Sequence, residues 1–160
     1  MVDVEEFLRE SNAIEDVYSE EALEDSLEAW DYLKQRDELN HEVVKEAHRL
    51  ILENLQPEIA GEYRDIQVYV GDHEPPDPEV VHLKMEELLE EVPETGEEAV
   101  KWHISFETIH PFADGNGRIG RLLYLWQCRQ LDVEPELWTA DERQQYYKIF
   151  DGRNGILETG

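Results

Sequence analysis

Apolar residues recur at spacings of three and four along most of this chain, and this spacing constrains its fold more than any other feature. The spacing places apolar side chains on one face of a helix, so the helices must pack against one another. The helix that is expected to begin near Asp77 should bury its apolar residues as far as Val92. We therefore expect an all-α fold, with helices that begin near Ser19, Asn40, Asp77, Thr95 and Asn116 and a last one over residues 142–150.

The segment 64–74 departs from the helical pattern. Apolar and polar residues alternate there, which is typical of a β-strand. Gly71 and Asp72 then favour a turn, and two prolines end any strand. We expect one short strand or a small β-hairpin, whose exposed edge is available to pair with another chain, so a homodimer is one assembly that it allows. The alternating residues are Ile66, Gln67, Val68, Tyr69 and Val70.

The size and charge of the chain limit its class. Its 160 residues fit a single domain over residues 1–160, and its formal net charge is −26. Such a charge repels phosphate backbones and anionic lipid, so we expect no binding to nucleic acid or to a membrane. No apolar run approaches the roughly 20 residues that span a bilayer, and the acidic N-terminus lacks the apolar stretch of a signal peptide. We expect a cytoplasmic protein, in which the single Cys128 excludes an internal disulfide and a cysteine metal cluster.

The acidity also bears on habitat. A folded domain with this charge is strained by self-repulsion, which salt screens and which halophilic proteins exploit. The 40 acidic residues against 14 basic ones therefore favour a cytoplasm rich in salt. The alternative is an ordinary acidic cytosolic protein.

One stretch, residues 110–121, differs from the rest of the chain in composition. Its sequence HPFADGNGRIGR contains three glycines and two arginines. The proline ends the preceding helix, and the glycines let the backbone turn tightly before the next helix begins near Asn116. The N–H groups and the positive dipole end of that helix then point into the turn, an arrangement that binds phosphate.

Charged side chains around this turn extend the interpretation. Arg118 and Arg121 are three residues apart and share a helix face, where they add donors for phosphate. Asp114 offers a hard oxygen ligand for Mg²⁺ or Mn²⁺ held jointly with phosphates. His110 titrates near neutrality and could serve as a general base. Together these residues predict a site for nucleotide phosphates, a divalent ion and a base; a Walker loop is excluded because no Lys-Ser or Lys-Thr follows the last glycine.

This stretch matches the signature HPFx[D/E]GNGRxxR at every specified position, and on it the chain is identified as a member of the Fic (filamentation induced by cAMP) family. The resemblance covers roughly residues 11–150. It implies a compact helical domain in which a β-hairpin flap over about residues 64–74 docks a target protein. It also implies that Tyr146 and Tyr147 lie near the nucleotide base.

The resemblance further implies an activity, the transfer of AMP from ATP to a Ser, Thr or Tyr hydroxyl of a target protein. By this resemblance His110 takes the proton of the hydroxyl, and Asp114 holds the metal ion. Arg121 meets the γ-phosphate. The implied nucleotide-binding residues are Gly115, Asn116, Gly117, Arg118 and Arg121.

Other activities on the same fold remain open. Doc-like kinases carry Lys at the position of Gly117, so the glycine favours AMP transfer over phosphate transfer. UMP transfer is not separated from AMP transfer by the motif. Removal of AMP from a target, with Glu15 positioning the attacking water, is a second enzymatic alternative. A catalytically silent binding module is the third, although the intact histidine, aspartate and arginines argue against it.

The N-terminal segment SNAIED resembles the inhibitory [S/T]xxxE[G/N] helix of the family, except that Asp16 replaces Gly or Asn. Ser11 and Glu15 are four residues apart and would share one face of a helix over residues 8–18. In the family the glutamate pairs with the second motif arginine, here Arg121, and denies it to the γ-phosphate. The resemblance thus implies a class II, self-inhibited protein.

Overall fold

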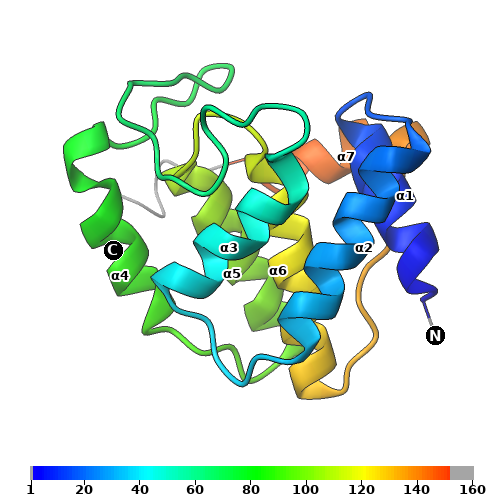
Figure 1. Ribbon diagram of the computed structural model, residues 1–160. Helices are drawn as coiled ribbons and strands as arrows, with labels where there is room; N and C mark the ends of the chain where they lie inside the picture. Colours follow the sequence, from blue (N-terminus) through cyan, green and yellow to red (C-terminus); the bar gives the residue numbers. More distant parts are fainter. Residues whose placement is uncertain (1, 152–160) are drawn as a thin grey trace.

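The computed structural model describes residues 2–151 and confirms the all-α fold (Figure 1). Short 3-10 helices, η1 (Pro78–Val80) and η2 (Ala140–Glu142), lead into the fourth and seventh α-helices. The α-helices are α1 (Val4–Ile14), α2 (Glu20–Lys34), α3 (His41–Leu52), α4 (Val81–Leu89), α5 (Gly96–Ile109), α6 (Asn116–Leu131) and α7 (Arg143–Lys148).

Side-chain caps fix the starts of three helices. The Ser19 hydroxyl accepts a hydrogen bond from the N–H of Ala22 at 3.1 Å and begins α2. The Asn40 side chain accepts a hydrogen bond from the third N–H group of α3. The Thr95 hydroxyl accepts one from the third N–H group of α5. Each cap satisfies an N–H group that has no partner inside its helix. The expected starts are therefore confirmed, whereas α7 is shorter than the helix expected over residues 142–150.

Helix α6 is the centre of the bundle, and Figure 1 shows it beside α5 with α2, α3 and α1 around it. Every residue from Arg118 to Cys128 is buried, which requires neighbours on all sides of the helix. The indole N–H groups of two tryptophans tie neighbouring helices together. Trp126 donates to the carbonyl of Leu33, and Trp102 donates to the carbonyl of Leu88. Val92 is 79% exposed because α4 ends at Leu89, so its expected burial is wrong.

The hairpin expected at residues 64–74 is reduced to a single bridge. The N–H of Val70 donates to the His73 carbonyl at 3.0 Å and the reverse bond is 2.9 Å, while no strand forms elsewhere within residues 2–151. Side chains bind the carbonyls that a strand ladder would use: Arg64 donates to Ile66, and Gln67 to Pro75. The segment is therefore an ordered loop held by side-chain hydrogen bonds.

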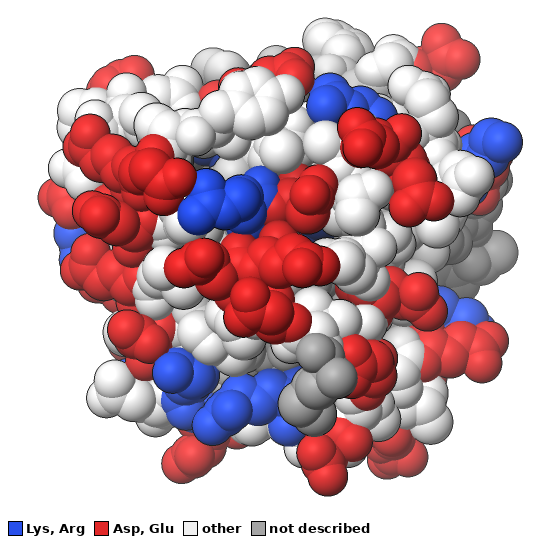
Figure 2. All heavy atoms as spheres, turned by 90° about the vertical axis from the view of Figure 1, so that its right-hand side faces the viewer, with Lys and Arg blue, Asp and Glu red and all other residues white. Residues whose placement is uncertain are grey.

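Acidic side chains cover much of the surface. Figure 2 shows the face that carries α1, where acidic residues are spread widely and basic residues form small groups among them. None of the helices within residues 2–151 combines the length and the apolar character needed to span a bilayer.

Candidate functional site

A cavity of about 840 Å³ brings together residues from both ends of the chain. Most residues predicted from the sequence line it. Ser11 lies beside it in contact with Arg121, whereas Ile66, Gln67 and Val68 are not among its lining residues. The predicted residues that line the cavity are Glu15, Tyr69, Val70, His110, Asp114, Gly115, Asn116, Gly117, Arg118, Arg121, Tyr146 and Tyr147.

His110 ends α5 in a left-handed backbone conformation, with φ 52° and ψ 61°. A buried arginine holds this bend: Arg64 donates from Nε to the His110 carbonyl at 2.7 Å and from Nη2 to that of Ile109 at 3.2 Å. The N–H of Arg64 also donates to the Pro111 carbonyl at 2.9 Å. A fixed bend places the imidazole at the cavity wall. The sequence assigned Arg64 to the flap but did not reveal this clamp.

His48 supports the same loop from α3, and sequence reasoning missed it. Its ring stacks on Phe112, with centroids 3.7 Å apart and planes 7° from parallel. Its Nδ1 accepts from the N–H of Gly61, so Nε2 carries the proton and donates to the Asp114 carbonyl at 2.9 Å. Burial lowers the pKa of His48 to about 4, which keeps the ring neutral. In the sequence, the feature that could have pointed to His48 was its position on the apolar face of the predicted helix.

The start of α6 is a tight turn whose free backbone N–H groups suit an anion. Gly115 precedes the helix with φ 83°, which glycine adopts without strain, and its N–H donates to Asp114 Oδ1 at 2.8 Å. The Asn116 side chain both accepts from the N–H of Phe112 and donates to its carbonyl. The side chain of Asn116 therefore shapes the loop. The first bond inside the helix runs from Ile119 to Gly115, so the N–H groups of residues 116–118 have no carbonyl one turn earlier.

Arg118 and Asp114 place opposite charges beside this turn. Their closest atoms, Nη2 and Oδ2, are 4.0 Å apart. Arg118 is 8% exposed, and its Nε is buried without a hydrogen-bond partner. A buried guanidinium donor that lacks a partner fits a site for an anion. Asp114 is 55% exposed at the cavity wall, so its carboxylate fits a hard divalent ion held jointly with phosphate oxygens.

Arg121 is held by hydrogen bonds to N-terminal and C-terminal groups. Its Nη2 donates to Glu15 Oε2 at 2.7 Å and to the Ser11 carbonyl at 2.9 Å, and its Nε donates to the Ser11 hydroxyl at 2.7 Å. Its Nη1 donates to the Tyr146 hydroxyl at 3.1 Å. Burial lowers the pKa of Arg121, but Tyr146 and Glu15 outweigh it and raise that pKa above its usual range. The side chain is 1% exposed and remains charged.

Glu15 reaches this arginine from the end of α1. The helix spans Val4–Ile14, not residues 8–18, so Glu15 is the residue that caps it. The carboxylate lies against the backbone of α6, because a Cβ placed on Gly117 would be 2.4 Å from Glu15 Oε2. In this conformation only glycine fits at position 117.

The two tyrosines of α7 differ. Tyr146 is 3% exposed, and its hydroxyl accepts from Arg121 and lies 2.7 Å from Nε2 of the buried His103. Tyr147 is 42% exposed and lines the cavity. Tyr146 therefore supports the arginine, and Tyr147 is the more exposed of the two tyrosines that line the cavity.

Comparisons with known proteins agree with this geometry. The chain is 37% identical over 116 residues to "Protein adenylyltransferase Fic" of Nematostella vectensis, covering 68% of this chain and 27% of that protein. It is 32% identical over 121 residues to "Protein adenylyltransferase fic-1" of Caenorhabditis elegans, covering 71% and 24%. The chain thus spans about a quarter of the length of these curated relatives.

Solved structures have the same fold. A Fic-domain signalling protein from Bacteroides thetaiotaomicron superposes with a TM-score of 0.78 at 22% identity, covering 92% of this chain and 70% of that one. A Fic family protein from Desulfovibrio desulfuricans gives 0.66 at 26% identity, covering 79% and 48%. The model of the Fic/DOC family matches residues 38–128, which is more than half of the chain and includes the turn at the start of α6. This chain belongs to the Fic/DOC family.

Proposed function

We propose that this protein is a nucleotidyltransferase that moves AMP from ATP to a hydroxyl side chain of a target protein. The observation that carries the proposal is the buried, unpartnered Nε of Arg118 beside the N–H groups that begin α6. That combination fits a phosphate chain. The curated relatives named above carry the same activity in their names.

His110 is proposed as the base. It lines the cavity, and the backbone bend that Arg64 fixes holds it there. As the target hydroxyl attacks the α-phosphorus of ATP, His110 accepts the hydroxyl proton. A new bond forms between the hydroxyl oxygen and the α-phosphorus, the bond from that phosphorus to its bridging oxygen breaks, and pyrophosphate leaves. A Ser, Thr or Tyr side chain supplies the hydroxyl.

The residues around His110 are proposed to hold the nucleotide. Backbone N–H groups of residues 116–118 and the Arg118 guanidinium would bind the phosphates, and Tyr147 would contact the base. Asp114 would hold Mg²⁺ or Mn²⁺, which when bound neutralises phosphate charge. In this role Gly117 admits the α-phosphate close to the helix start.

Glu15 is proposed to inhibit the enzyme from within its own chain. Arg121 makes four hydrogen bonds, and three of them go to this carboxylate and to Ser11. The guanidinium is therefore not available to a γ-phosphate. ATP that binds in this state would lack its terminal clamp, and its α-phosphate would be misaligned for attack. We propose residues 1–160 as a single domain in which α1 acts as the inhibitory element; residues 152–160 lie outside the described part.

The test is to incubate the protein with a cell lysate and ATP labelled on the α-phosphate. Glu15→Gly should label protein bands that Glu15→Gly combined with His110→Ala does not. ATP labelled on the γ-phosphate should leave those bands unlabelled, which separates AMP transfer from phosphate transfer, and labelled UTP tests UMP transfer. Absence of α-label in Glu15→Gly would contradict the proposal, whereas release of AMP from a modified target by wild type would favour the reverse reaction.

A further inference from the structure

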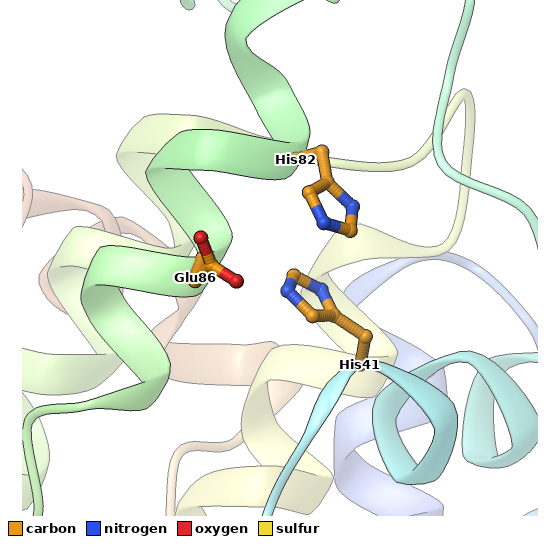
Figure 3. Close-up of side chains that lie close together, drawn as sticks. All are labelled: His41, His82 and Glu86. Carbon is orange, nitrogen blue, oxygen red and sulfur yellow. The ribbon is translucent and has the colours of Figure 1, made fainter.

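Two histidines and a glutamate converge on one point of the surface, away from the cavity described above. His41 opens α3, and His82 and Glu86 are four residues apart on α4. Figure 3 shows the three side chains pointing toward one another across the gap between the two helices. Their potential ligand atoms all lie within 4.8 Å of one another. From this geometry we propose that His41, His82 and Glu86 bind a Zn²⁺ ion that fastens α3 to α4.

The spacing of these ligands suits a metal. Ligand atoms around a tetrahedral zinc ion are roughly 3.3 Å apart, because each lies about 2.0–2.2 Å from the ion. His82 and Glu86 are exposed, so modest side-chain rotations can close the remaining distance. Residues four apart on a helix share a face, which keeps their two ligands together without any movement of the backbone.

The polar groups of the three side chains are not satisfied by hydrogen bonds within the cluster. The two imidazoles stack with centroids 4.0 Å apart and planes 11° from parallel. No hydrogen bond or ion pair joins His41, His82 and Glu86, all of which are among the described residues. The Nε2 atom of His41 is buried without a partner. A buried ring nitrogen that lacks a partner next to a carboxylate is what a bound cation would satisfy.

The other ring nitrogen of His41 is already fixed. Its Nδ1 lies 2.8 Å from the hydroxyl of Tyr63. Histidine ligands of metals usually have such a partner on the second nitrogen, which sets the orientation of the ring. Tyr63 also packs on Phe112, with centroids 5.4 Å apart, so the site is linked to the loop that carries His110.

The ligand set indicates which ion binds. Two imidazoles and one carboxylate suit zinc and other first-row transition ions such as Fe²⁺, whereas Mg²⁺ and Ca²⁺ prefer oxygen ligands alone. Three protein ligands leave a fourth position, which solvent can fill at this exposed place. Because His41 and the two ligands on α4 come from different helices, the ion would stabilise the folded state over the unfolded one.

The experiment uses the full chain, freed of metal by a chelator and then dialysed. Calorimetric titration should show one Zn²⁺ ion per chain, and a Zn²⁺ concentration about a hundred times Kd should raise Tm by roughly 5 °C or more. His82→Ala and Glu86→Gln should each weaken binding at least tenfold. Both positions are exposed, so the variants should fold, and circular dichroism would verify this.

Two control variants separate this site from others. Glu87→Gln changes an exposed neighbour on α4 and should leave binding unchanged. Asp114→Ala removes the carboxylate proposed for the nucleotide-bound ion and should also leave it unchanged. Binding that survives His82→Ala, binding that is lost in Asp114→Ala, or a folded wild type that takes up no stoichiometric Zn²⁺ would each overturn the proposal. None of these results depends on whether the protein transfers AMP.

Discussion

The Glu15 carboxylate lies 2.7 Å from the Arg121 guanidinium, although 106 residues separate the two in sequence. The pair closes α1 onto the start of α6, at the wall of the cavity. A charged pair in this position holds the arginine that we propose to bind the γ-phosphate.

Removing the Glu15 carboxylate should activate the enzyme. Glu15→Gly should raise the rate of AMP transfer at least tenfold, because Arg121 loses a charge-assisted partner and can bind phosphate. Ser11→Ala, which removes one of the other bonds to Arg121, should activate less. The measurement is incorporation of α-labelled AMP into a defined target.

The matched control is Glu6→Gln, since Glu6 is an exposed glutamate of α1. Glu10 is unsuitable because its side chain accepts from the N–H of Ala140 at 2.9 Å. Equal transfer by wild type and Glu15→Gly would show that the Glu15–Arg121 contact does not inhibit.

Gly117→Ala should destabilise the wild type by roughly 1–3 kcal/mol, because its Cβ would be 2.4 Å from Glu15 Oε2. In a Glu15→Gly background the same change should cost less, because only the Arg121 guanidinium, whose Nη1 would be 2.9 Å from that Cβ, still crowds it. Urea unfolding of the wild type, the two single variants and the double variant gives the coupling energy between positions 15 and 117. Gly96→Ala is the control, because its Cβ would meet only Val133 at 3.6 Å; additive effects of Gly117→Ala and Glu15→Gly would contradict the contact.

Stability should fall as the pH is lowered from about 6.5 toward 3. Burial lowers the pKa of His103 to about 3, whereas in the unfolded chain it titrates near 6.5. Within this window the unfolded state holds one more proton at His103, so this group alone lowers the stability by up to about 1.4 kcal/mol per pH unit, and His48, whose pKa is about 4, adds to the slope. Urea titrations between pH 7.5 and 4 measure the slope.

His103→Gln should be less stable than wild type at pH 7.5 but should show a smaller slope below pH 6.5. The loss at neutral pH comes from the hydrogen bond between His103 and Tyr146. An unchanged slope in this variant would mean that His103 does not remain neutral in the fold.

Asp114→Asn should abolish the dependence of ATP binding on Mg²⁺. Asparagine keeps a side-chain oxygen that can accept from the N–H of Gly115, so the loop should retain its shape. It lacks the negative charge that a hard divalent ion requires. Calorimetric titration of ATP with and without Mg²⁺ tests this, and an unaltered Mg²⁺ effect would place the ion elsewhere.

Salt should stabilise the protein. The net charge of −26 repels itself over about 10 Å at 0.1 M salt and over about 3 Å at 1 M. Melting curves in KCl should therefore show a higher Tm at the higher concentration. A flat or falling Tm would contradict the salt-rich habitat and would leave the family assignment intact.

The sequence by itself determined most helix starts and the turn over residues 110–121, because both depend on neighbouring residues. Apolar spacing and the caps Ser19 and Asn40 locate the helix starts, and these signals act within one turn. The turn over residues 110–121 is equally local. Its proline and glycines specify a helix start with free N–H groups wherever it lies in the fold, and its arginines add positive charge there.

The tertiary structure decided which distant groups meet. Nothing local indicates that Arg64 clamps the carbonyl of His110, or that His48 fixes the loop at Asp114, because each contact joins residues more than 40 positions apart. The expected hairpin is reduced to the bridge between Val70 and His73 for the same reason. Its alternating pattern is typical of a strand, but the side chains of Arg64 and Gln67 bind the carbonyls that a partner strand would use. Hydrogen bonds between side chain and backbone depend on packing, so only the folded chain reveals them.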